Sequence, residues 1–109
     1  MEKELQHRIA ANEDAFREVN EGIARGQWPG EQDAPLAFRC ECARLGCNDL
    51  VEVTIRKYES VRRHPRWFLV VTGHELPDLE KVVESGAGYL VVEKNDDAGE
   101  SAESLDPRT

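Results

Sequence analysis

Four side chains that bind metals in proteins stand at two places in this sequence of 109 residues, and they constrain its fold more than any other feature. Cys40, Cys42 and Cys47 fall within eight residues and are all the cysteines of the chain, while His74 follows a strongly apolar run. Three thiolates and one imidazole are a ligand set that a structural zinc ion takes in tetrahedral geometry. An ion bound by all four would join two distant parts of the chain.

The spacing of the cysteines fits a metal site better than a disulfide. Cys40 and Cys42 are two residues apart, so on an extended chain they point to the same side, with Cα atoms about 6.5–7 Å apart. A disulfide between two such residues on a regular strand is strained, whereas two thiolates can hold one ion. A turn at Gly46 can return Cys47 as a third ligand, and His74 is the best fourth ligand.

Two alternatives to this site stay open at the level of sequence. The C-x-C-x4-C spacing is less specific than paired C-x-x-C motifs, and the cysteines can be buried apolar thiols with His74 a polar turn residue. His64 and His7 are alternative fourth ligands. Three thiols within eight residues nevertheless favour one zinc ion, held by Cys40, Cys42, Cys47 and His74.

The predicted site is structural and has no catalytic residues. Four protein ligands leave a zinc ion no open coordination position. The His74-Glu75 pair lacks the second histidine of zinc proteases, and the deaminase motif is absent. The sequence also has no phosphate-binding glycine loop and no nucleophile elbow, so we expect a protein that is not an enzyme.

Composition indicates one small cytoplasmic domain with a modest core. Hydrophobic residues make up 39% of the chain and aromatic residues 6%, so a metal would add much to stability. No apolar stretch is long enough to span a membrane, and the N-terminus lacks a signal peptide. An odd number of cysteines fits a reducing compartment. The net charge of −8 argues against nucleic-acid binding, because phosphate contacts need an excess of Lys and Arg.

Hydrophobic patterning predicts an α+β fold with an N-terminal amphipathic helix and a small mixed or antiparallel sheet crossed by one short helix. The expected strands are residues 36–42, 50–53, 67–72, 81–84 and 89–93, with the last two forming a hairpin. The expected short helix is 55–63, capped by Thr54. We divide the chain into the helix 1–25, a linker loop 26–37, a zinc-stabilised domain 38–94 and a disordered acidic tail 95–109.

The N-terminal helix carries an apolar stripe with one asparagine, and its other face is charged. The stripe can pack on the chain's own sheet, the interpretation we favour, or bind a protein partner, with a homodimer as one arrangement. The stripe consists of Leu5, Ile9, Asn12, Phe16, Val19 and Ile23. The face we expect in solvent consists of Glu13, Asp14, Arg17, Glu18 and Glu21.

A basic cluster precedes the longest apolar run and consists of Arg56, Lys57, Arg62, Arg63, His64 and Arg66. It can be a solvated face with arginines paired to carboxylates, which the acidic character of the chain favours. Alternatively it can bind phosphate or an acidic partner, and the chain's own tail is one such partner.

Six short stretches together resemble a family of small, largely uncharacterised bacterial proteins of zinc-binding type. The resemblance covers most of residues 8–94 and implies that the three cysteines and His74 belong together. It also implies that the Asn12-Glu13 and Asn20-Glu21 pairs matter beyond solubility, and it carries over no activity. The matching stretches are 12–21, Phe38-Arg39-Cys40-Glu41-Cys42 with Cys47, Tyr58 with Val61-Arg62, Pro65-Arg66-Trp67-Phe68, Gly73-His74-Glu75 and 89–94.

The sequence therefore predicts a non-enzymatic interaction or regulatory module, stabilised by one structural zinc ion and binding a protein partner. One alternative is a thiol-based redox or zinc sensor that releases its metal on oxidation. A second alternative is a small cysteine-dependent enzyme, for which His74 is the only base that the pattern offers.

Overall fold

The computed structural model describes residues 3–26, 33–44 and 46–106, and of residues 3 and 5–7 it describes the backbone alone. Within these ranges the chain forms three helices and five strands, and the predicted α+β class is confirmed. The strands form two antiparallel sheets. One is a hairpin of β1 (Pro35–Arg39) and β2 (Leu50–Thr54), and the other has the order β3-β5-β4.

The three-stranded sheet grows from the most apolar part of the sequence. It consists of β3 (Trp67–Val71), β4 (Glu80–Gly86) and β5 (Tyr89–Lys94), and the predicted hairpin of the last two strands is confirmed. Leu69 in β3 lies opposite Val91 in the central strand β5, and both are fully buried. Continuous apolar runs of this kind are typical of strands covered on both faces.

The helix α2 (Ile55–Arg62) begins where the sequence predicts it. The Thr54 hydroxyl accepts a hydrogen bond from the Lys57 N–H at 3.0 Å, which satisfies one of the free donors of the first turn. The inward residues include Tyr58, whose ring stacks on that of Phe38 with centroids 4.4 Å apart. The helix is thereby fixed between the hairpin and β3.

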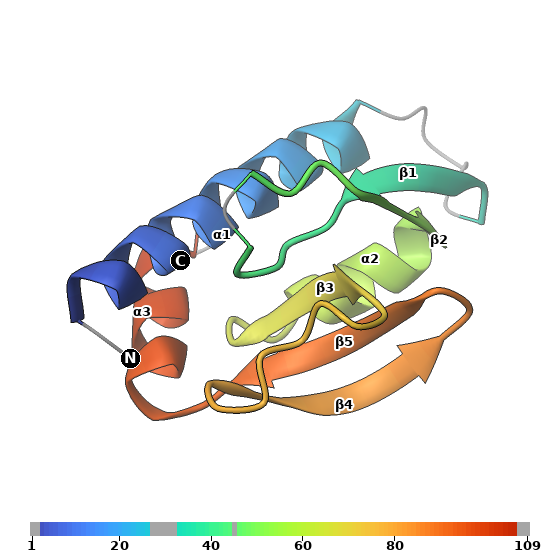
Figure 1. Cartoon of the computed structure of the whole chain (residues 1–109). Coiled ribbons are helices and arrows are strands. Elements are labelled where there is room, and N and C mark those ends of the chain that lie inside the picture. Colours follow the sequence, from blue (N-terminus) through green and yellow to red (C-terminus); the bar gives the residue numbers. More distant parts are fainter. Residues whose placement is uncertain (1–2, 27–32, 45, 107–109) are drawn as a thin grey trace.

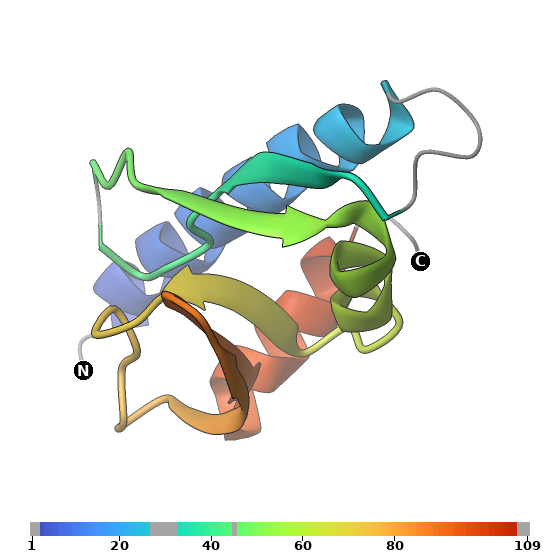
Figure 2. The same ribbon diagram turned by 90° about the vertical axis from the view of Figure 1, so that its right-hand side faces the viewer.

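Figures 1 and 2 show the layers of the domain. The hairpin and the three-stranded sheet lie one above the other, α2 closes one end, and α1 runs along the side with α3 beside it. The core that they share is made of apolar side chains and two of the cysteines. Its buried members are Phe38, Cys40, Cys42, Val51, Val53, Tyr58, Val61, Phe68, Leu69, Val70, Leu90, Val91, Val92 and Ala102.

The helix α1 (Lys3–Arg25) packs on its own domain, but the face it buries differs from the predicted one. Ile9 is buried as expected, whereas Val19 is 48% exposed, and the side chain of Leu5 lies outside the described residues. The expectation that Glu13, Arg17 and Glu21 face solvent is wrong. Among the described side chains of α1, the buried ones are Ile9, Glu13, Arg17, Asn20 and Glu21.

Each buried charge of α1 has a partner that is remote in sequence. Glu13 pairs with Lys94, which also binds Glu80. The Arg17 guanidinium donates to the carbonyl oxygens of Pro65 and Ala102 at 2.9 and 2.8 Å. Glu21 accepts from Arg62 Nε at 2.6 Å. Helical periodicity places these residues on a polar face but does not reveal that the polar face is covered, which explains the error.

The acidic segment 95–106 is ordered, and the prediction of a disordered tail is wrong for these residues. They include the helix α3 (Asp96–Leu105), in which Gly99 and Ala102 are buried. Two of the five acids that suggested disorder are paired, because Asp106 binds Arg62 and Glu103 binds Arg66. Residues 107–109 lie outside the described residues.

The structure also bears on the predictions for the linker and for the basic cluster. The linker predicted at 26–37 ends earlier, because β1 begins at Pro35, and residues 27–32, with Trp28, lie outside the described residues. In the basic cluster, Arg56, Lys57, Arg62 and Arg66 pair with carboxylates, as the favoured interpretation expects. The pairs are Arg56–Asp33, Lys57–Glu84, Arg62–Glu21, Arg62–Asp106 and Arg66–Glu103.

Candidate metal centre

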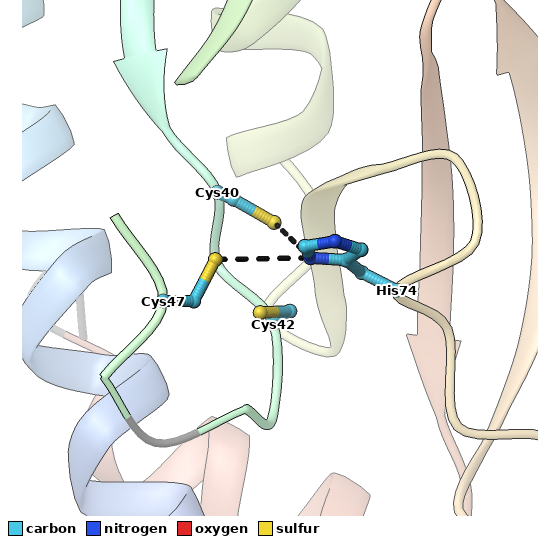
Figure 3. Close-up of side chains that lie close together, drawn as sticks. All are labelled: Cys40, Cys42, Cys47 and His74. Atoms are coloured by element: carbon cyan, nitrogen blue, oxygen red, sulfur yellow. Dashed lines mark hydrogen bonds between the residues drawn. The ribbon is translucent and has the colours of Figure 1, made fainter. Parts of the chain in front are cut away.

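The three cysteines and His74 converge at one place, as the sequence predicts (Figure 3). Cys40 and Cys42 lie just beyond the end of β1, and Cys47 precedes β2. His74 follows β3, in a turn closed by a hydrogen bond from its N–H to the Val71 carbonyl at 2.9 Å. The site therefore joins the two sheets.

Two glycines make the turns that carry Cys47 and His74. Gly46 has φ +83° and Gly73 has φ +94°, a left-handed backbone that glycine adopts without strain. The Arg44 guanidinium donates to the Gly73 carbonyl at 2.9 Å and so links the two turns. These local features hold the third and fourth side chains near the first two.

The candidate ligand atoms are close enough to share one ion. One atom from each of the four side chains lies within 4.8 Å of all the others. The Nδ1 atom of His74 is 3.6 Å from Cys40 Sγ and 3.7 Å from Cys47 Sγ. The imidazole thus turns Nδ1 toward the sulfurs, and the group can hold a metal ion through three Sγ atoms and one Nδ1.

Each sulfur also accepts a hydrogen bond from a backbone N–H. The donor to Cys40 Sγ is Val71 N, at 3.2 Å. The donors to Cys42 and Cys47 are the backbone amides of Arg44 and Asp49. Amide donors stabilise a thiolate relative to a thiol, and thiolates are the form that binds metals.

The thiol pKa values diverge because the cysteines are so close. A hydrogen bond from Cys40 lowers the pKa of Cys42 to about 5, and the same hydrogen bond raises the pKa of Cys40 above its usual range. Burial raises the pKa of Cys47. A bound cation would offset the mutual repulsion of the three thiolates and favour their deprotonation.

The other nitrogen of His74 faces a carboxylate. Its Nε2 lies 3.4 Å from Asp49 Oδ2, on a side chain that is 60% exposed. A carboxylate beside the second nitrogen of a metal-binding histidine fixes the tautomer and ring orientation. Asp49 was not among the residues singled out in the sequence, and an acid two residues after Cys47 is too common a signal to identify it.

Access to the centre is uneven. Cys40 and Cys42 are 1% and 0% exposed, whereas Cys47 is half-buried and the His74 side chain is 12% exposed. Solvent therefore reaches the site from the side of Cys47 and His74.

Glu41 lies between two candidate ligands and is fully buried. Its Oε2 accepts from Asn20 Nδ2 and from the Tyr58 hydroxyl, both at 2.8 Å, and its Oε1 accepts from Leu69 N at 2.9 Å. Burial raises the pKa of Glu41, and these hydrogen bonds to the charged form oppose the rise. The sequence offers no signal for this role, since the three donors come from three remote elements.

The segment after β1 also completes the edge of β3. Glu41 N donates to the Leu69 carbonyl at 2.8 Å, and Leu69 N and Val71 N donate to Glu41 Oε1 and Cys40 Sγ. A carboxylate and a sulfur thus accept the hydrogen bonds that carbonyls accept in a regular sheet. The candidate metal centre and β3 are therefore directly connected.

Of the two alternative fourth ligands, His64 does not join the centre. His64 stacks on Trp67 with ring centroids 3.7 Å apart, and the side chain of His7 lies outside the described residues. In the described part of the chain, no helix is long and apolar enough to cross a membrane.

Comparison with protein-family models, with curated proteins and with solved structures finds no match for this chain. The resemblance to small bacterial proteins of zinc-binding type stays a prediction. The function is inferred below from the chemistry of the site itself.

Proposed function

We propose that the chain is a non-enzymatic interaction or regulatory module whose fold is stabilised by one structural zinc ion. The observation that supports this most is the geometry around His74. Four ligands placed tetrahedrally around zinc, with bonds of about 2.3 Å to sulfur and 2.0–2.1 Å to nitrogen, have nitrogen–sulfur edges of about 3.6 Å. The distances from His74 Nδ1 to Cys40 and Cys47 are 3.6 and 3.7 Å.

The ligand set supports zinc over other metals. Three sulfurs and one imidazole nitrogen form a soft set, which suits zinc and excludes the oxygen-loving ions magnesium and calcium. In a tetrahedral zinc site two sulfur atoms are about 3.8 Å apart. The candidate ligand atoms lie within 4.8 Å of one another, so each sulfur–sulfur distance would shorten by about 1 Å or less on binding the ion. Thiols that bind zinc must stay reduced, which supports a cytoplasmic location.

A structural role follows from the number of ligands. Catalytic zinc sites use three protein ligands and keep one position for water or substrate, whereas this group offers four ligand atoms, enough to fill every position of a tetrahedral ion. The ion would join the end of β1, the start of β2 and the turn after β3. Apparent binding energies of structural zinc sites are about 10–16 kcal/mol in small peptides, enough to decide whether a domain of this size folds.

With no open position at the metal, function would depend on the surface. The surface that we assign to a protein partner is the outer face of α1, where Val19 is 48% exposed. Light scattering of the zinc-loaded protein and of Val19→Glu tests whether the partner is a second copy of the chain. A dimer that Val19→Glu dissociates supports that arrangement, and a monomer in both cases excludes it.

Metal analysis tests the zinc site. We expect about one zinc per chain after purification without added metal, and a strong chelator to abolish the cooperative thermal unfolding transition. His74→Ala should lose the metal, whereas the matched variant His64→Ala should keep it, because His64 packs on Trp67 away from the sulfurs. Absence of metal, or equal retention by the two variants, would overturn the proposal.

A redox sensor is the second candidate, and the low pKa of Cys42 favours it. A hydrogen bond from Cys40 lowers the pKa of Cys42 to about 5, and the thiolate is the form of cysteine that peroxide oxidises. Hydrogen peroxide would oxidise two thiols to a disulfide, itself being reduced to two waters, and the ion would leave. Zinc release by mild peroxide, reversed by a reductant, would support sensing. Retention of zinc would exclude it.

A further inference from the structure

We propose that metal binding controls the docking of α1, so that the metal-free protein releases this helix while the strands stay folded. The inference rests on the proposed metal site and adds a form of regulation to it. It follows from the polar nature of the interface and from where its central contacts lie.

The buried side chains of α1 are mostly polar, and Ile23 and Ala24 add partly buried apolar contacts with the core. Among the described side chains of α1, Ile9 is the one buried large apolar residue, and the other buried members are charged or amide side chains. Hydrogen bonds and ion pairs weaken steeply when distances or angles change, whereas apolar contact tolerates small displacements. An interface of this kind responds strongly to a small shift of its partner groups.

Asn20 makes the central contacts, and all of them lie beside the metal centre. Its Oδ1 accepts from Arg39 N at 2.7 Å, and its Nδ2 donates to the Arg39 carbonyl at 2.9 Å and to Glu41 Oε2 at 2.8 Å. Asn20 is fully buried. Its partners thus flank Cys40 on both sides, and one of them lies between the two most buried cysteines.

Residues 40–42 are held both by backbone hydrogen bonds and by contacts of the cysteine sulfurs. The pairing of β1 with β2 ends at Arg39. Beyond it, Cys40 N donates a hydrogen bond to the Asp49 carbonyl at 2.9 Å, and the contacts of Glu41 and of the sulfurs hold the rest of the segment. Without a cation, no bond fixes the spacing of the three sulfurs and His74 Nδ1, so the segment that carries Cys40 and Cys42 can shift relative to β3. A displacement of about 1 Å is enough to break the hydrogen bonds to Asn20.

Breaking these contacts disfavours the docked helix. Glu41 is a fully buried carboxylate, and loss of a hydrogen-bond donor leaves its charge poorly solvated. Undocking of α1 admits water to Glu41 and relieves that cost. The other polar contacts of α1, from Glu13 to Lys94, from Arg17 to two carbonyls and from Glu21 to Arg62, are also made by groups that water can solvate.

Hydrogen exchange of the full-length protein tests the coupling directly. With zinc bound, the amides of α1 and of β3 and β5 should both be protected. After the metal is removed, α1 amides should exchange at least about tenfold faster while β3 and β5 keep their protection, and added zinc should restore α1. Unchanged protection of α1, or loss of protection in α1 and the strands together, would overturn the coupling.

Reciprocity gives a second measurement. If zinc favours docking, docking must favour zinc by the same factor. Asn20→Ala, which removes no metal ligand, should therefore weaken zinc affinity about tenfold in competition with a chromophoric chelator. The matched variant Val19→Ala, on the exposed side of the same helix, should bind zinc like the unchanged protein. Equal affinity of the two variants would contradict the inference.

The two proposals fail in different ways. A chain that takes up no zinc would overturn the structural zinc site, and the coupling with it. A chain that binds one zinc with no difference in α1 exchange would keep the zinc site and overturn the coupling alone.

Discussion

The Oδ2 atom of Asp49 lies 3.4 Å from Nε2 of His74, on the ring nitrogen opposite the one that faces the sulfurs. This arrangement predicts that Asp49 orients the imidazole for metal binding. Outer carboxylates of this kind change metal affinity by about 10–100-fold, and the exposure of Asp49 places it at the low end.

Asp49→Asn should therefore weaken zinc affinity about tenfold, measured by competition with a chromophoric chelator. The matched control is Asp33→Asn, which removes an exposed carboxylate that pairs with Arg56 far from the centre. An unchanged affinity for Asp49→Asn would mean that the imidazole needs no outer partner.

Glu41→Gln should destabilise the zinc-loaded protein. Both carboxylate oxygens of Glu41 accept hydrogen bonds, so an amide must point its NH2 group at a donor in either orientation. We expect a loss of about 2–3 kcal/mol in the free energy of unfolding, measured with urea. Glu52→Gln, at an exposed position of β2, should change it by less than about 0.5 kcal/mol. Equal stabilities would contradict the assigned network.

Arg62→Met should be strongly destabilising for a different reason. It removes the cation that binds Glu21 of α1 and Asp106 after α3, both buried, and loss of one partner from a buried ion pair costs about 3–5 kcal/mol. Arg63→Met, at the exposed neighbouring position, should have little effect. Urea denaturation of both variants at pH 7 makes the comparison. A small effect at Arg62 would mean that α1 and α3 are not held by this pair of contacts.

Stability should depend on pH through Glu13. Burial raises the pKa of Glu13 from 4.5 to about 7, against the attraction of Lys94. A carboxyl group whose pKa is higher in the folded state binds its proton more tightly there. The stabilising contribution of Glu13 to the free energy of unfolding is therefore present at low pH and is lost as the pH rises from about 4.5 to about 7.

Glu13→Gln cannot ionise, so its stability relative to the unchanged protein should increase over that interval, by at most about 1.4 kcal/mol per pH unit. Urea titrations of both proteins at pH 5, 6, 7 and 8 give the difference between their free energies of unfolding. The metal site is the same in both proteins, so its pH dependence cancels in this difference. Glu18→Gln, on the exposed side of α1, serves as the control. A difference that does not vary with pH would show that Glu13 keeps an ordinary pKa.

The candidate metal centre was predictable because its signals are local. Cys40 and Cys42 are in register along an extended segment, Gly46 permits the turn to Cys47, and His74 ends the most apolar run. Ligand chemistry then limits which side chains can meet, and the four do lie together. The strands and α2 were predictable for the same reason, since alternation and the Thr54 cap act within a few residues.

The position of α1 and the order of α3 were not predictable from such signals. Glu13, Arg17 and Glu21 have the helical spacing of an exposed polar face, and the partners that bury them, such as Lys94 and Arg62, are more than forty residues away. The acids of residues 95–106 suggest a solvated tail, but Arg62 and Arg66 pair with two of them, Asp106 and Glu103. Long-range charge pairing is the part of this fold that composition hides.

The edge of β3 has a consequence for the behaviour of the protein at high concentration. An uncovered strand edge invites another molecule to extend the sheet, which begins aggregation. At Leu69 and Val71 that position is occupied by Glu41 and Cys40 of the same chain. Residues 40–41 thus shield this part of the sheet from intermolecular growth. A molecule in which these residues move away from β3 exposes a strand edge on which a second molecule can pair.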